Sequence, residues 1–381
     1  MRIYIDVSVL TLATYVTGIQ RATIEIASRL MSCKNKEVVL LYFNVSKNAY
    51  FIIDNDAFTE YYVAHKGIKE KMITKREVPI SDMGEGTIFF DLDGAWMGRI
   101  KRSYLLPILK QQGCKIIAHI YDIISITHPQ FCEERGVYNF MDYIGAHLKY
   151  ADKIIVNAEA TVKELENLSQ QIGCVLPKCE VVCLGADFQK GEVQEKQIDT
   201  SIKEIVKSKP YILMVGTLEP RKNHKLMIEA YNCGLKELGY NVIFAGYMGW
   251  NMEQFEQKMK EHADYGKGIF HFVGLDDVTI SYLYQNAKFL AFCSYTEGFG
   301  LPIIEALQRG TPVLAADVPV LREVGGDFCL WFEQDNAQML CDVVKEYTQD
   351  ALRYGKLKEQ VMLFQATNWD ETIRKINPCL E

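Results

Sequence analysis

The sequence predicts an α/β fold made of two doubly wound domains that face each other across a cleft. The chain has 381 residues, which is more than a single hydrophobic core usually serves. In both halves, short apolar runs rich in β-branched residues alternate with stretches of helical periodicity, a pattern typical of parallel sheets covered by helices. A polar run rich in Lys, Glu and Gln separates the halves.

The first domain is expected over residues 1–190. Its apolar runs predict five strands, and apolar residues at helical spacing predict helices between several of them. The expected strands are residues 3–5, 38–43, 87–90, 115–120 and 153–156, and the expected helices are residues 19–31, 104–111 and 138–150.

A linker is expected at residues 191–208, followed by a second domain over residues 209–365 and a C-terminal helix within residues 366–381. The second domain repeats the alternation of the first. Its expected strands are residues 211–215, 241–245, 269–273, 289–293 and 312–315, and its expected helices are residues 223–233, 252–262, 277–285 and 302–308.

Composition excludes several classes of protein. Hydrophobic residues make up 49% and charged residues 24%, as in an ordinary soluble protein, and a net charge of −7 argues against a nucleic-acid partner. Neither a signal peptide nor an apolar run of ~20 residues is present, so a cytoplasmic protein is expected. The basic stretch at residues 66–76 is interpreted as a solvated helix or loop face, with peripheral contact to the inner membrane face as the alternative.

The most informative segment is Glu-Gly-Phe-Gly-Leu-Pro-Ile-Ile-Glu at residues 297–305. Its glycines indicate a loop, and Leu301 is expected to begin a helix with Pro302 in the first turn. Free N–H groups and the helix dipole at such a start attract an anion, most often a phosphate. Glu297 before the loop and Glu305, expected in the first helical turn, can accept hydrogen bonds from hydroxyls on either side. This arrangement predicts a nucleotide-sugar site.

Other loops are expected at the same edge of the second sheet. Ligands of open α/β sheets bind beyond the carboxyl ends of the strands, and residues 217–222, 246–248, 274–276 and 294–300 each follow an expected strand directly. Arg221 and Lys222 can place two cations on a diphosphate. The alternative is a surface pair that completes a helix cap with Asn223.

These residues resemble the donor-site signature of the family-4 retaining glycosyltransferases (glycosyltransferases group 1). The resemblance covers most of the chain and is most specific in the second half. It rests on residues 294–302, 305–307, 310–313 and 215–223, and in the first half on residues 17–21, 119–122, 128–129 and 151–156. It implies the GT-B fold of two Rossmann-like domains, in which the C-terminal helix crosses back onto the first domain. Asn157-Ala158 departs from the family pattern, in which serine is common.

The resemblance implies a role for each site residue. Arg221 and Lys222 would bind the donor's phosphates, Glu297 the hydroxyls of the transferred sugar and Glu305 the nucleotide ribose. His119 would lie close to the transferred sugar, with a histidine held in a loop for structural reasons as the alternative. The expected catalytic set is Arg221, Lys222, Glu297 and His119, and the expected donor-binding set is Gly18, Thr217, Gly298, Phe299, Gly300, Leu301 and Glu305.

The acceptor side is expected in the first domain, with Asp122 and Asp93 at the ends of strands. Asp91-Leu92-Asp93 is similar to the metal-binding motif of a different glycosyltransferase fold. Arg221 and Lys222 already supply positive charge in the other domain, so no metal and no other cofactor is expected.

The function expected from the resemblance is retaining transfer of a hexose-like sugar from a nucleoside-diphosphate sugar to a saccharide or lipid-linked acceptor. GDP-mannose is favoured as the donor over a UDP-sugar, and bacterial surface polysaccharide or lipopolysaccharide assembly is the expected setting. A nucleotide-sugar 2-epimerase of the same fold and a catalytically idle nucleotide-sugar-binding subunit are the alternatives.

Overall fold

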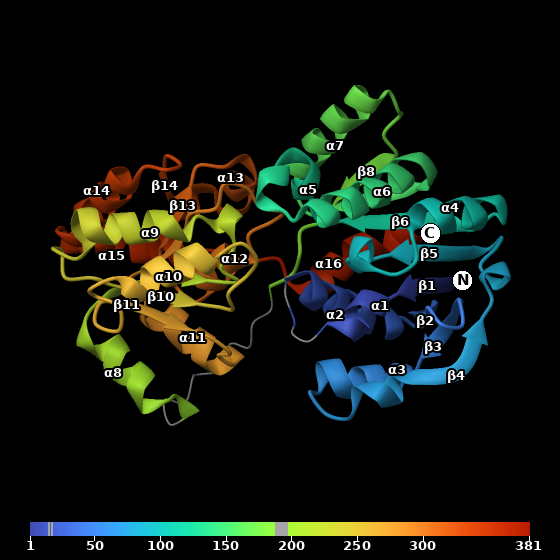
Figure 1. Ribbon diagram of the computed structural model, residues 1–381, viewed down its shortest axis with the longest axis horizontal. Helices are drawn as coiled ribbons and strands as arrows, with labels where there is room; N and C mark the ends of the chain where they lie inside the picture. The colour runs from blue at the N-terminus through green and yellow to red at the C-terminus, as the bar shows by residue number, and fades with distance from the viewer. Residues whose placement is uncertain (14–15, 17, 187–196) are drawn as a thin grey trace. The chain divides into compact units, whose positions relative to one another are not determined.

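Residues 1–13, 16, 18–186 and 197–381 are described by a computed structural model, and the chain divides into two units (Figure 1). One unit comprises residues 1–185 and 367–381, and the other comprises residues 186–366. Each unit contains one sheet with helices packed around it. The predicted fold class, α/β with two doubly wound units, is confirmed.

The first unit is built on an eight-stranded mixed sheet in the order β4-β3-β2-β1-β5-β6-β7-β8. Its central and later strands are parallel, whereas β3 is antiparallel to both β2 and β4. The strands are β1 (Arg2–Asp6), β2 (Glu37–Asn44), β3 (Ala49–Ile53), β4 (Ile73–Val78), β5 (Thr87–Asp91), β6 (Lys115–Ile120), β7 (Lys153–Val156) and β8 (Lys178–Val181).

The five predicted strands of the first half are present, but β3, β4 and β8 were not predicted. Four residues, 45–48, connect β2 to β3, and a connection this short can join only antiparallel neighbours. The basic stretch is therefore partly a strand: Lys75 and Arg76 are exposed on β4, an edge position where charged side chains discourage pairing with another chain. The interpretation of residues 73–76 as helix or loop was wrong.

The helices of the first unit include the C-terminal helix. They are α1 (Ser8–Leu12), α2 (Gly18–Met31), α3 (Asn55–Phe58), α4 (Arg102–Gln111), α5 (Ile124–Thr127), α6 (Glu134–Tyr150), α7 (Glu159–Ile172) and α16 (Trp369–Ile376). A capping box begins α16, because Asn368 Oδ1 accepts from Glu371 N at 2.8 Å and Glu371 Oε2 accepts from Asn368 N at 3.1 Å. The helix packs against α2 (Figure 1).

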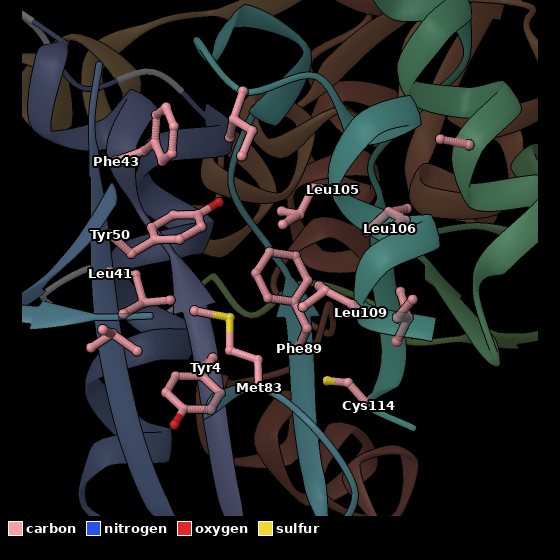
Figure 2. Packing of buried hydrophobic residues seen from close by; sticks show 14 residues of the cluster. Tyr4, Leu41, Phe43, Tyr50, Met83, Phe89, Leu105, Leu106, Leu109 and Cys114 are labelled. Carbon is pink, nitrogen blue, oxygen red and sulfur yellow. The ribbon is translucent and has the colours of Figure 1, made fainter. Parts of the chain in front are cut away.

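A hydrophobic core lies between the sheet of the first unit and α4 (Figure 2). Tyr4 and Phe89 come from the neighbouring strands β1 and β5, and they share this core with Leu105, Leu106 and Leu109 of α4. The three leucines recur at the spacing that places side chains on one face of a helix. Burial of this face fixes α4 on the sheet.

A buried ion network extends from the same helix. Arg102 donates to both carboxylate oxygens of Asp91, at 2.7 and 2.8 Å, and to Asp6 Oδ2 at 2.9 Å. His147 Nε2 of α6 lies 2.9 Å from Asp91 Oδ2. Burial would raise the pKa of Asp91, but the charge and hydrogen bonds of Arg102 and His147 outweigh burial and lower it. The network thus joins β1, β5, α4 and α6 through buried polar contacts.

In the second unit, the described residues form a parallel six-stranded sheet in the order β11-β10-β9-β12-β13-β14. The strands are β9 (Tyr211–Val215), β10 (Asn241–Ala245), β11 (Ile269–Phe272), β12 (Phe289–Phe292), β13 (Val313–Ala316) and β14 (Cys329–Phe332). The helices are α8 (Thr200–Ser208), α9 (His224–Ala230), α10 (Glu253–Glu261), α11 (Asp277–Asn286), α12 (Leu301–Gln308), α13 (Pro319–Gly325), α14 (Ala337–Thr348) and α15 (Ala351–Val361).

The five strands predicted for the second half are present, and β14 was not predicted. Of the predicted linker at residues 191–208, residues 191–196 lie outside the described part of the chain, and α8 occupies residues 200–208. Across the described ranges, every helix is too short or too polar to span a membrane.

Candidate functional site

The strand order of the second unit reverses between β9 and β12. From β9 the chain builds outward to β10 and β11, and it then returns to place β12 on the other side of β9. Loops that leave two such strands diverge and leave room for a ligand between them. The loop after β9 carries Arg221 and Lys222, and the loop after β12 carries Glu297.

Arg221 and Glu297 meet at this switch point. Arg221 Nη1 lies 2.6 Å from Glu297 Oε2 and 3.2 Å from the carbonyl oxygen of Thr296, and Arg221 Nε donates to Glu219 Oε2 at 2.9 Å. Ser294 Oγ donates to the other oxygen of Glu297 at 2.8 Å. Burial would raise the pKa of Glu297, but the charges of Arg221 and Lys222 outweigh burial and lower it. Glu297 is therefore held as a carboxylate.

Lys222 lies against the backbone at the end of β9. A Cβ atom at Gly216 would lie 2.5 Å from Lys222 Nζ, and the φ angle of 122° at this position favours glycine. Burial and the charge of Arg221 lower the pKa of Lys222, against the opposing effect of Glu297. The ammonium of Lys222 lies beside Arg221 and can donate hydrogen bonds to an anionic ligand.

The Gly-Phe-Gly loop ends at the start of α12, as predicted. Gly300 has φ 103° and is the N-cap, Leu301 is the first helical residue, and Pro302 lies in the first turn. Phe299 is buried. This start leaves backbone N–H groups without intrahelical partners, which is the arrangement that binds phosphate.

Glu305 was expected in the first turn of α12, but it lies just beyond that turn, so this expectation was wrong. Its side chain is mostly buried, and its Oε2 accepts a hydrogen bond from Tyr284 OH of α11 at 2.7 Å. The guanidinium of Arg309 lies 5.4 Å from the centre of the Tyr284 ring. The helix therefore presents a carboxylate whose orientation is set by a neighbouring helix.

Of the other predicted donor residues of the second half, Thr217 and Gly298 are partly buried in the same two loops, and Leu301 is partly buried at the start of α12. The loops after β9 and β10 also pack closely, because a Cβ atom at Gly246 would lie 2.1 Å from the carbonyl oxygen of Gly216. The structure thus brings together the second-unit residues that the sequence analysis placed at the site.

Several site residues were missed. Glu219 pairs with Arg221, Tyr284 orients Glu305, and Gln334 and Asp335 contact the loop that carries Glu297. The signal for the last two was the apolar run 329–332 after Gly326, which indicates a short strand whose loop would end at the same edge.

His119, predicted to lie near the transferred sugar, is the residue before the last of β6 in the first unit and is fully buried. Its Nε2 lies 2.8 Å from Asn157 Oδ1, and its ring stacks on Tyr121 at 4.4 Å. Burial lowers the pKa of His119 to about 4, so the ring is neutral at pH 7. Within the described ranges Nδ1 has no hydrogen-bond partner. At Asn157, where serine is common in the resembled family, this chain thus places a side-chain amide, rather than a hydroxyl, beside His119.

Two further predicted site residues of the first unit, Gly18 and Asp122, lie at or just before the start of a helix. Gly18 begins α2 and is exposed, whereas Thr17 of the same motif lies outside the described residues. Asp122 Oδ1 accepts from the backbone N–H of Ile124, the first residue of α5, at 3.0 Å. The predicted acceptor role of Asp122 stays a prediction.

Asp93, the other predicted acceptor-side residue, is fully buried. Its two oxygens accept from Leu10 N at 2.7 Å and Gly94 N at 2.8 Å, which fixes the start of α1. Asp91 of the same Asp-x-Asp motif is engaged with Arg102 and His147. Burial raises the pKa of Asp93 to about 7, and the backbone hydrogen bonds only partly oppose burial.

Asp93→Asn should change how stability depends on pH. The pKa of Asp93 is higher in the folded protein than its ordinary value of 3.8, so its stabilising contribution is full below pH ~4 and is lost as the pH rises through ~7. We expect the free energy of unfolding of the wild type, relative to Asp93→Asn, to fall between pH 4 and pH 7 in urea titrations. The control Asp56→Asn, at an exposed position of α3, should leave that slope unchanged. Parallel curves for wild type and Asp93→Asn would contradict the prediction.

The chain resembles known proteins over nearly its whole length. Residues 195–362 match the family model "Glycosyl transferases group 1". The chain is 24% identical over 363 residues to the serotype-specific mannosyltransferase WbdA of Escherichia coli, covering 91% of this chain and 41% of that protein. It is 34% identical over 143 residues to O-antigen chain mannosyltransferase B of the same organism, with 37% of each chain covered. The chain thus spans about two fifths of the length of these relatives.

A solved structure shares the fold across both units. Anabaena Alr3699/HepE, determined in complex with UDP and glucose, superposes with a TM-score of 0.69 at 15% identity and covers 100% of this chain and 99% of its own. Together with the two α/β units, each built on one mainly or wholly parallel sheet, this similarity confirms the GT-B fold. Over residues 195–362, the chain is similar to the glycosyl transferases of group 1.

Proposed function

We propose that the chain transfers a mannosyl group from a nucleoside-diphosphate sugar, with GDP-mannose as the donor, to a saccharide or lipid-linked acceptor in O-antigen or related surface polysaccharide assembly. The observation that carries the proposal is the paired placement of two cations, Arg221 and Lys222, and the carboxylate of Glu297 at the switch point of the second sheet. Two relatives named as mannosyltransferases support mannose as the transferred sugar.

Each group has a defined part in the proposed reaction. The cations of Arg221 and Lys222 and the N–H groups at the start of α12 bind the diphosphate and stabilise the charge that grows on it as the glycosidic bond breaks. Glu297 accepts hydrogen bonds from sugar hydroxyls, and Glu305 from the nucleotide ribose. These contacts hold the donor in a reactive orientation.

We propose that the reaction retains the configuration of the sugar. The carboxylates of Glu297 and Glu305 already accept hydrogen bonds from Ser294 and Tyr284, which suits binding of hydroxyls better than covalent attack. The leaving diphosphate would then take the proton of the acceptor hydroxyl on the same face of the sugar. The reaction would need no metal, since Arg221 and Lys222 supply positive charge.

A nucleotide panel tests the proposal. Thermal unfolding is measured with GDP, UDP, ADP, TDP and CMP, with EDTA and then with Mg²⁺, and release of nucleoside diphosphate from GDP-mannose and UDP-glucose is followed. We expect GDP to raise the melting temperature equally in EDTA and in Mg²⁺, and GDP release to exceed UDP release. Preference for UDP would overturn the GDP-mannose assignment, and stabilisation that requires Mg²⁺ would overturn metal independence. Failure of every nucleotide to bind would overturn the donor site.

The same assay separates transfer from the alternatives. A 2-epimerase would convert a UDP-sugar without an acceptor, and an idle subunit would bind nucleotide without turnover. The mannosyltransferase relatives do not favour the epimerase.

A further inference from the structure

The loop that follows β14, residues 333–336, contacts both loops of the candidate donor site. Gln334 Nε2 donates to the carbonyl oxygen of Tyr295 at 3.0 Å and lies 3.5 Å from that of Ser294. Asp335 Oδ1 accepts from Tyr295 OH at 2.5 Å and from Asn223 Nδ2 at 2.9 Å. This loop lies outside the segment 297–305, and its contacts reach the loops that follow two different strands, β9 and β12.

The residues that this loop contacts are neighbours of Arg221, either along the chain or through a backbone hydrogen bond. The backbone N–H of Tyr295 donates to the carbonyl oxygen of Arg221 at 2.8 Å, so the loop after β9 is joined directly to the loop after β12. Asn223 stands two residues after Arg221 and also caps α9. Asp335 therefore accepts from one residue on each of the two loops and links them through one carboxylate oxygen.

The backbone conformations of Asn223 and Asp335 support a role for this contact in positioning the two loops. Asn223 and Asp335 have φ angles of 51° and 58°, in the left-handed region that costs energy for residues other than glycine. Such conformations persist where surrounding contacts hold them, and they cluster at functional sites. Here the two strained residues are hydrogen-bonded to each other.

We propose that Asp335, Tyr295 and Gln334 are positioning residues, which hold the guanidinium of Arg221 and the carboxylate of Glu297 in register for the leaving diphosphate. The proposal rests on the function proposed above. Loss of one contact lets the two loops shift relative to each other, and a displacement of about 1 Å at a reacting group can cost up to ~10²-fold in rate.

Tyr295→Phe and Asp335→Ala test the proposal in the full chain. Each should lower kcat for nucleoside-diphosphate release from GDP-mannose roughly 10-fold, within the range that misplacement allows. Asp335→Asn keeps an acceptor oxygen and tolerates the left-handed backbone, so it should retain most activity. Tyr265→Phe and Asp350→Ala, which change a tyrosine and an exposed helix-capping aspartate elsewhere in the unit, should leave kcat unchanged.

Two readouts distinguish positioning from general destabilisation. If Tyr295 acts through Arg221, the double variant Tyr295→Phe/Arg221→Ala should be no slower than Arg221→Ala alone. Amide hydrogen exchange over residues 217–223 should be faster in Tyr295→Phe and Asp335→Ala than in the controls. Additive rate losses, or unchanged exchange and kcat, would overturn the positioning role. A wild type that neither binds nor turns over any nucleotide sugar would instead overturn the proposed function.

Discussion

Arg221→Ala should lower kcat for nucleoside-diphosphate release by at least ~10²-fold, and Lys222→Ala should have an effect of the same order. Each variant removes one of two cations beside the site where negative charge grows on the leaving diphosphate. One such electrostatic contact contributes ~3 kcal/mol at the transition state, and each 1.36 kcal/mol corresponds to about a tenfold change in rate. Steady-state kinetics with GDP-mannose measure the effect.

The matched control is Lys225→Ala. Its side chain is 78% exposed on α9, and its ammonium pairs with Glu229, so its removal changes the net charge without altering the site. Arg221→Ala also leaves Glu219 and Glu297 without their shared cation, so its thermal unfolding must be measured beside its activity. Near-normal turnover in both Arg221→Ala and Lys222→Ala would contradict the assignment.

Arg102→Met should destabilise the first unit by about 3–5 kcal/mol. The methionine fills much of the arginine's volume but leaves Asp6 and Asp91 buried without the guanidinium that pairs with both. A buried carboxylate without its partner is costly, because desolvation is no longer offset. Urea unfolding of the full chain, followed by fluorescence, should show the transition of the first unit at lower denaturant concentration.

Arg322→Met provides the control for the same chemistry at the surface. Arg322 binds both oxygens of Asp317 at 2.7 Å, but both side chains are about half exposed. Exposed pairs of this kind contribute under about 1 kcal/mol. Equal losses for Arg102→Met and Arg322→Met would show that burial does not govern the Arg102 network.

The loop before α12 and the charged residues of the candidate donor site could be predicted from the sequence because each depends on residues that are adjacent along the chain. The glycines before Leu301 and the proline after it specify a loop that turns into a helix, and Gly300 indeed takes the left-handed backbone that this turn requires. Arg221 and Lys222 follow a strand directly, so the carboxyl-edge rule for parallel sheets placed them on the correct edge.

The added strands β3, β4, β8 and β14 escaped prediction for a physical reason. Charged residues interrupt β4 and β8, so these strands show no apolar run, and the short apolar runs of β3 and β14 do not by themselves distinguish a strand from a segment of buried helix or loop. The antiparallel edge of the first sheet therefore depends on pairings that local periodicity does not encode.

The sequence alone was enough to establish two α/β units, the glycine-rich start of α12 and the identity of the charged groups beside it, because turn chemistry and hydrophobic alternation act over a few residues. Only the tertiary structure decided the partners: Arg221 with Glu297, Tyr284 with Glu305, and Asp335 with Asn223 and Tyr295. It also placed Asp93 and His119 inside the first unit. Such contacts depend on strand order and on burial, and both arise from packing of segments that are distant along the chain.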